Sequence, residues 1–193
     1  RFEYDGDDLH SMIDKIGIAI ITMFGIGHIK HAPGTIASFV TCLIFYFFIE
    51  PYTEFETFIV LFIVLFFCSI IIIDKLSKYF KKKDPKEIVI DEFFGQLSAF
   101  VFFILFFVII RKFFSMSLLI QSNLLEPIVN NKEITIILFF ILFRFFDILK
   151  PYPINIIDKK IKKGLGVMLD DIVAGLYTAC VMIISLYLYH FLN

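Results

Sequence analysis

Five carboxylates fall in short polar patches that interrupt otherwise apolar runs, and their residue types are suited to metal-assisted chemistry. They are Asp91, Glu92, Asp147, Asp170 and Asp171. If these groups converge at low dielectric, they repel one another unless a cation compensates their charge. Mg²⁺ prefers carboxylate oxygens together with water and phosphate. The patches therefore predict a Mg²⁺ site, with all five carboxylates as candidate metal ligands and catalytic residues.

Two cationic side chains accompany one of these carboxylates. Arg144, Asp147 and Lys150 are spaced i, i+3, i+6, which predicts one broad helix face. An Arg fork and a Lys point charge beside a metal site would form a phosphate clamp. Pro151 and Pro153 follow directly and should end the helix after Lys150.

A fourth patch, His31 to Ser38, contains hydroxyl groups at the start of an apolar run. Pro33 and Gly34 favour a helix start, and we expect Thr35 to cap it. Free backbone N–H groups at such an end can face an anion. Thr35 and Ser38 are therefore candidate phosphate-binding residues, together with Arg144 and Lys150.

Each patch also has a simpler structural explanation. Acidic residues at a helix start, such as Asp91-Glu92 and Asp170-Asp171, match the helix dipole. Arg144 and Asp147 could be a local ion pair, and the threonine and serine could be plain caps. Ionisable groups within membrane segments are nevertheless functional by default, and five carboxylates at one membrane face need a common reason.

Composition identifies the environment in which these patches must be positioned. Hydrophobic residues make up 59% of the 193 residues, including 27 Phe, and the mean hydropathy is +0.87. Soluble globular proteins contain roughly 45–50% apolar residues, so we predict an all-α, polytopic membrane helical bundle. The net charge of -1 identifies no partner, and we expect no nucleic-acid binding. The cysteines, Cys42, Cys68 and Cys180, lie in apolar runs without metal-type spacing.

About five membrane spans are predicted, with a short N-terminal interfacial or half-buried helix over Ile16 to Ile29, where Gly25 and Gly27 interrupt the apolar run. Residues 1–14 read as an acidic, solvated tail, and residues 15–193 as a single membrane domain. The five apolar runs cover about 35–50, 57–73, 94–110, 134–149 and 172–192.

The distribution of lysine predicts the orientation. Five crossings place the loops 74–93 and 150–171 on one side of the membrane, and these loops are rich in Lys. The loops 51–56 and 111–133 on the other side carry few cations. The positive-inside rule places the Lys-rich side in the cytoplasm, and all four polar patches fall on that side. Most of these lysines need no role beyond topology and lipid-headgroup contact.

In their order and residues, the four patches resemble the motifs of the phosphatidylglycerophosphatase A family. The matching segments are Pro33-Gly34-Thr35-Ile36-Ala37-Ser38, Asp91 to Gly95, Arg144 to Pro153, and Gly164 to Gly175. The chain departs from the family pattern at Ala37 and Lys163, where the family usually has Gly.

The resemblance implies a bacterial, Mg²⁺-dependent enzyme of the cytoplasmic (inner) membrane. Its expected reaction is hydrolysis of the terminal phosphate of phosphatidylglycerophosphate, which gives phosphatidylglycerol in phospholipid biosynthesis, at an active site facing the cytoplasm. The expected partner is this phospholipid. The departures remove no carboxylate, so we expect activity to survive them.

Two alternatives remain open from the residues alone. One is another lipid-phosphate phosphatase. The other is a divalent-cation transporter, because carboxylates inside membranes also mark ion paths. A transporter would need acidic residues at several depths, whereas here they cluster at one face. Signatures of cysteinyl phosphatases, haloacid-dehalogenase phosphatases, type 2 lipid phosphatases and CDP-alcohol transferases are missing from the sequence.

Overall fold

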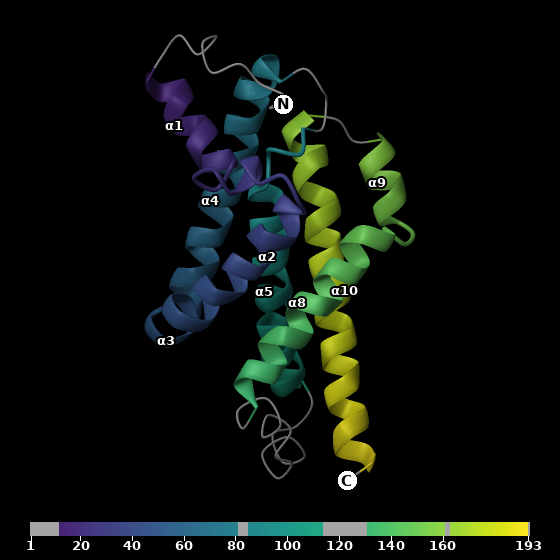
Figure 1. Cartoon of the computed structure of the whole chain (residues 1–193). Coiled ribbons are helices and arrows are strands. Elements are labelled where there is room, and N and C mark those ends of the chain that lie inside the picture. Colours follow the sequence, from purple (N-terminus) through teal and green to yellow (C-terminus); the bar gives the residue numbers. More distant parts are fainter. Residues whose placement is uncertain (1–11, 81–84, 114–130, 161–162, 193) are drawn as a thin grey trace.

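A computed structural model describes residues 12–80, 85–113, 131–160 and 163–192 of the chain (Figure 1). Every regular element within these ranges is helical, which confirms the all-α prediction. The elements are α1 (Met12–Ile21), η2 (Ile26–His28), α2 (Pro33–Ile44), the π-helical η3 (Phe45–Ile49), α3 (Glu50–Tyr52), α4 (Phe55–Leu76), η4 (Ser77–Tyr79), α5 (Ile90–Phe113), α8 (Lys132–Leu149), α9 (Ile154–Lys160) and α10 (Lys163–Leu192).

Each of the five predicted apolar runs lies in a helix. By length and composition, the segments Phe55–Tyr79, Ile90–Ile110 and Gly164–Tyr189 could cross a membrane. The helix over Pro33–Ile49 is apolar but shorter. α8 has 18 residues and carries charged side chains near both ends. In Figure 1, α2 and α8 run obliquely beside the longer helices.

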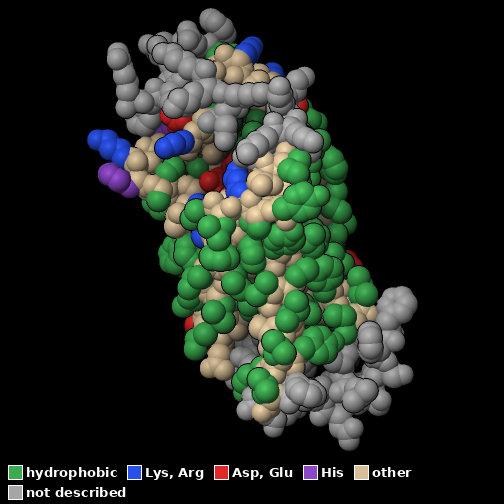
Figure 2. All heavy atoms as spheres, turned by 90° about the vertical axis from the view of Figure 1, so that its right-hand side faces the viewer, with side chains coloured by type: hydrophobic (Ala, Val, Ile, Leu, Met, Phe, Trp, Pro, Cys, Tyr) green, Lys and Arg blue, Asp and Glu red, His purple; other side chains and the backbone are tan. Residues whose placement is uncertain are grey.

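The chain direction brings the polar patches to one end of the bundle. α2, α5 and α10 begin in the upper half of Figure 1, and α8 ends there, whereas the C-terminus lies at the bottom. Hydrophobic side chains cover the middle and lower part of the face in Figure 2, and most of the visible charged side chains gather toward the upper end. The expectation that the four patches share one end is therefore confirmed.

α5 is the central helix. Half of its apolar window is buried inside the protein, compared with 17% for α4 and 33% for α10. In its middle, Phe100 stacks on Phe45 with ring centroids 3.9 Å apart and packs against Phe139 of α8 at 4.8 Å. Such ring packing matters because lipid is as apolar as the side chains, so helices associate in membranes through close fit.

Glycine permits the closest contact between α5 and α10. A Cβ atom on Gly175 would lie 2.6 Å from the Gly95 carbonyl oxygen and 3.0 Å from the Ala99 nitrogen. Real side-chain carbons do not tolerate a 2.6 Å contact with backbone, so the two backbones can approach this closely only at glycine. Gly95 and Gly175 thus act as the small residues that permit close helix packing in membranes.

The N-terminal segment differs from the expected tail at its last residues. Met12 to Asp14 belong to α1, and Asp14 is buried. The Tyr79 hydroxyl donates a hydrogen bond to the Asp14 carboxylate at 2.8 Å, and the Lys75 ammonium lies 3.5 Å from it. The predicted tail residues 1–11 lie outside the described part of the chain.

A second acidic side chain at this end fixes the start of α10. Asp74, near the end of α4, accepts a hydrogen bond from the Gly164 N–H at 2.7 Å. This N–H is one of the donors that a helix start leaves without an intrahelical partner. Asp74 therefore acts as a cap supplied by a neighbouring helix and positions the first turns of α10.

Candidate active site

Three of the five predicted carboxylates meet where α5 and α10 begin. Asp91 and Glu92 lie in the first turn of α5, and Asp171 lies in the third turn of α10. One carboxylate oxygen from each lies within 4.8 Å of the other two. Asp171 is buried, and the other two are partly buried. This spacing is close enough for a single ion to contact all three residues.

The oxygens of this cluster are suited to a hard cation. Asp91 Oδ1 and Glu92 Oε2 are buried, and neither has a hydrogen-bond partner within the described ranges. Buried carboxylate oxygens without partners are costly, and Mg²⁺ binds such oxygen ligands. The residues present therefore fit the predicted metal, with Asp91, Glu92 and Asp171 as the candidate ligands.

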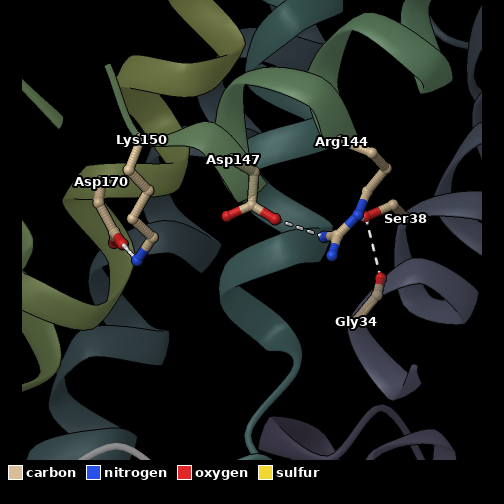
Figure 3. A network of polar contacts seen from close by, with 6 residues as sticks. All are labelled: Gly34, Ser38, Arg144, Asp147, Lys150 and Asp170. Atoms are coloured by element: carbon tan, nitrogen blue, oxygen red, sulfur yellow. Dashed lines mark hydrogen bonds and ion pairs between the residues drawn. The ribbon is translucent and has the colours of Figure 1, made fainter. Parts of the chain in front are cut away.

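Arg144 lies beside this cluster and forms an ion pair on its own helix. Its Nη1 is 2.7 Å from Asp147 Oδ2, and the two side chains are 15% and 13% exposed. The same nitrogen donates to the Ser38 hydroxyl at 3.4 Å, and that hydroxyl donates to the Gly34 carbonyl at 3.0 Å (Figure 3). The local ion pair between Arg144 and Asp147 is therefore confirmed.

Asp147 also links the ion pair to the carboxylate cluster. Its carboxyl group lies close enough to that of Asp171 for the two to interact. Arg144 Nε is buried and has no hydrogen-bond partner among the described residues. The guanidinium therefore keeps a donor available at the edge of the cluster, which an anionic ligand could use.

The predicted stripe from Arg144 to Lys150 is wrong at its last residue. α8 ends at Leu149, and Lys150 is its C-cap in the left-handed conformation with φ 43°. The chain therefore turns away before the i+6 position, and the Lys150 ammonium contacts Asp170 Oδ2 at 2.7 Å. In Figure 3 this pair and Arg144 lie on opposite sides of Asp147. The expected helix end before Pro151 is confirmed.

Thr35 does not cap α2. The N-cap is Ala32, with φ 47° and no side-chain cap bond, and Thr35 lies within the first turn, half-buried. The space at the helix start is taken by Glu92, whose Oε1 would be 1.9 Å from a Cβ on Gly34. A carboxylate at a helix start is favoured by the helix dipole, so Gly34 leaves room for a candidate metal ligand.

Both departures from the family pattern lie in helices. Ala37 is fully buried in α2, packed in the core cluster that contains Val89 and Met168. Its methyl group is therefore accommodated without disturbing the helix. Lys163 is the first residue of α10.

The sequence motifs assign no role to Gln96. It lies one turn after Glu92 on α5 and is fully buried. Neither its amide nitrogen nor its amide oxygen has a hydrogen-bond partner in the described part of the chain. An uncompensated buried amide costs stability, so this position is a candidate functional residue. Its place directly after the Asp-Glu-x-x-Gly motif was the available signal.

Comparison with known proteins supports the family suggested by the motifs. Residues 19–186 match the family model described as Phosphatidylglycerophosphatase A. The chain is 54% identical over 43 residues to Phosphatidylglycerophosphatase A of Haemophilus influenzae, and 44% identical over 43 residues to that of Escherichia coli. Each alignment covers 22% of this chain, and about a quarter of the relative's length, 26% and 25% respectively.

A third relative aligns along most of both chains. The Putative phosphatidylinositol-3-phosphatase of Bacteroides thetaiotaomicron is 30% identical over 165 residues, which cover 83% of this chain and 87% of the relative. No solved structure matches the chain. The family match covers most of the sequence and includes all four motifs and the carboxylate cluster, so the chain belongs to the phosphatidylglycerophosphatase A family.

Proposed function

We propose that this protein hydrolyses the terminal phosphate of phosphatidylglycerophosphate to give phosphatidylglycerol. The observation that carries the proposal is the meeting of Asp91, Glu92 and Asp171 beside Arg144, at one end of an apolar helical bundle. Family membership and the names of two relatives support this substrate. The name of the Bacteroides relative indicates a different phosphorylated lipid, which shares the phosphomonoester and the acyl chains.

We propose that Mg²⁺ is held by Asp91, Glu92 and Asp171, where it would neutralise phosphate charge and act as a Lewis acid. Arg144 would turn its free Nε donor to the phosphate and stabilise the charge that develops there. The Asp147 carboxylate and the Ser38 hydroxyl hold the guanidinium in place. Asp147 and Arg144 thus have positioning and charge-stabilising roles, whereas Lys150 holds Asp170 beside the cluster.

The membrane placement follows from the same proposal. The polar end would face the cytoplasm of a bacterial cell from the inner membrane, because the Lys-rich loops belong to that end. The lipid substrate would remain in the cytoplasmic leaflet with its phosphate at the polar end. A divalent-cation transporter is less well supported, because the carboxylate cluster in the described part of the chain lies at one end of the bundle.

The test is phosphate release by purified protein from phosphatidylglycerophosphate and from phosphatidylinositol 3-phosphate, with Mg²⁺ and with EDTA. We expect turnover of the first lipid, its loss in EDTA and its recovery with Mg²⁺. Asp171→Asn should lower the rate by about 10²-fold or more, on the scale of removing a group that stabilises the transition state.

Glu50→Gln is the matched control, because it removes a carboxylate that pairs with Lys132 at the far end of the bundle. It should leave the rate unchanged. Full activity in EDTA would refute the metal proposal. Faster turnover of phosphatidylinositol 3-phosphate would refute the choice of substrate while leaving the phosphatase reaction intact.

A further inference from the structure

A groove on the lipid-facing surface runs between α2 with η3 on one side and α8 on the other. Its volume is about 270 Å³, and almost all of its lining is apolar. Phe39 and Leu43 line it from α2, and Ile137 and Phe140 line it from α8. Phe39, Leu43 and Ile137 are 50%, 40% and 54% exposed, so the groove is open to surrounding lipid.

One end of the groove is lined by residues that neighbour the candidate active site in the sequence. Phe39 directly follows Ser38, and Phe140 lies one turn before Arg144. The contact between Arg144 and Ser38 joins the same two helices just above the groove. The rings of Phe39 and Phe140 meet edge to face, with centroids 5.9 Å apart, at this end.

The lining at the other end of the groove includes two polar side chains. The Tyr46 hydroxyl donates to the Glu133 carboxylate at 2.9 Å, and both residues line the groove. Between Phe39 and Tyr46 the helix rises by about 10 Å at 1.5 Å per residue. The hydrocarbon region of one leaflet is about 15 Å deep, so the groove is long enough to hold part of an acyl chain.

We propose that this groove binds one acyl chain of the phospholipid whose phosphate is bound beside Arg144. The inference rests on the proposed function only in requiring a phosphorylated lipid as substrate. The Arg144 cation at the upper end matches the phosphate of such a lipid, and the apolar groove below it matches an acyl chain. The Arg144–Ser38 contact at the upper end favours a lipid that carries a phosphate as the occupant, and not an apolar helix of a second copy.

Binding in the groove should fix the position of the lipid and add little to its affinity, because an acyl chain gains little free energy from leaving lipid for an apolar groove. Holding the chain fixes where the lipid enters relative to Ser38 and Arg144, and so aligns the phosphate with the carboxylates. The groove should therefore favour lipids with long chains over lipids that carry the same head group on short chains.

Ile137→Trp and Leu43→Trp test this by filling the groove from either wall. Turnover is compared for phosphatidylglycerophosphate with long acyl chains and with six-carbon chains, in the same detergent. We expect kcat/KM for the long-chain lipid to fall about tenfold, mainly through kcat because the phosphate is no longer aligned with the carboxylates, and the short-chain value to fall much less. Val64→Trp on α4 is the matched control, since Val64 is 53% exposed and lies outside the groove. It should change neither value.

An equal loss for both lipids would overturn the proposal, because the site itself would then be disturbed. An unchanged long-chain value would also overturn it, as would a change in oligomeric state without a change in chain preference.

The chain contains no native Trp, which permits a second measurement independent of turnover. A phosphatidylglycerophosphate with brominated acyl chains should quench a Phe47→Trp fluorophore, which replaces one groove-lining aromatic ring by another and leaves the groove open, at a mole fraction that leaves the Val64→Trp fluorophore unquenched. Quenching without phosphate release would refute the proposed function and retain the groove, and equal quenching of both would refute the groove.

Discussion

Gly175→Ala should separate α5 from α10 and loosen the carboxylate cluster. The added Cβ would lie 2.0 Å from the Ser98 hydroxyl oxygen, 2.6 Å from the Gly95 carbonyl oxygen and 3.0 Å from the Ala99 nitrogen. The Ser98 side chain can rotate away, but the two backbone atoms move only with their helix. Asp171 lies one turn before Gly175, so any separation is carried directly to the cluster.

The size of the effect follows from these contacts. Ordinary contact begins at 3.4 Å, so the Gly95 oxygen at 2.6 Å must retreat by about 0.8 Å. Overpacking of this kind destabilises proteins by about 1–3 kcal/mol. The higher helix propensity of Ala offsets this by about 1 kcal/mol at most. Misplacement of catalytic groups by about 1 Å can cost 10²-fold in rate, so we expect turnover to fall by about 10- to 100-fold.

The assay combines thermal unfolding in detergent with phosphate release at saturating Mg²⁺. Ser98→Ala provides a rescue test, because it removes the 2.0 Å contact and leaves both backbone contacts in place. The double variant should therefore recover only part of the lost stability and turnover relative to Gly175→Ala. A double-mutant cycle measures this coupling.

Two outcomes would refute this reasoning. Full rescue by Ser98→Ala would show that the side chain, and not the backbone, limits the approach of the helices. Native turnover in Gly175→Ala would show that the cluster does not depend on this crossing. Ser98→Ala alone loses the hydrogen bond to the Gly95 carbonyl at 2.7 Å, so its own unfolding temperature is the reference for the cycle.

Two further predictions concern single polar side chains. Gln96→Leu should raise the unfolding temperature, because it removes a buried amide without a hydrogen-bond partner within the described residues, whose burial costs about 1–3 kcal/mol of stability. It should also lower turnover, because that amide lies one turn after Glu92. Unchanged turnover would assign Gln96 no functional role. Lys150→Ala should destabilise the protein strongly, because it leaves the buried Asp170 without its 2.7 Å ion pair. Lys132→Ala breaks an exposed ion pair with Glu50 and should cost about 1 kcal/mol of stability or less. Equal losses of stability in the two variants would contradict the proposed importance of burial.

The sequence by itself determined the class of fold, the helical segments and the grouping of the patches. Apolar runs of this length are compatible with few structures in lipid, since every backbone group must be satisfied within its own helix. The alternation of direction from one apolar segment to the next then places the start of α2, α5 and α10, and the end of α8, at the same end. Gly95 and Gly175 could also be assigned to close packing, because only small residues allow it.

Only the tertiary structure decided which charges meet. All five carboxylates belong to one end of the bundle, but only Asp91, Glu92 and Asp171 form the cluster. Asp147 and Asp170 form ion pairs with Arg144 and Lys150, respectively. The pairing of Lys150 with Asp170 depends on a left-handed residue at the end of α8, which helical spacing does not reveal. The groove between α2 and α8 likewise depends on how two oblique helices cross, a relation between segments about a hundred residues apart that no local pattern encodes.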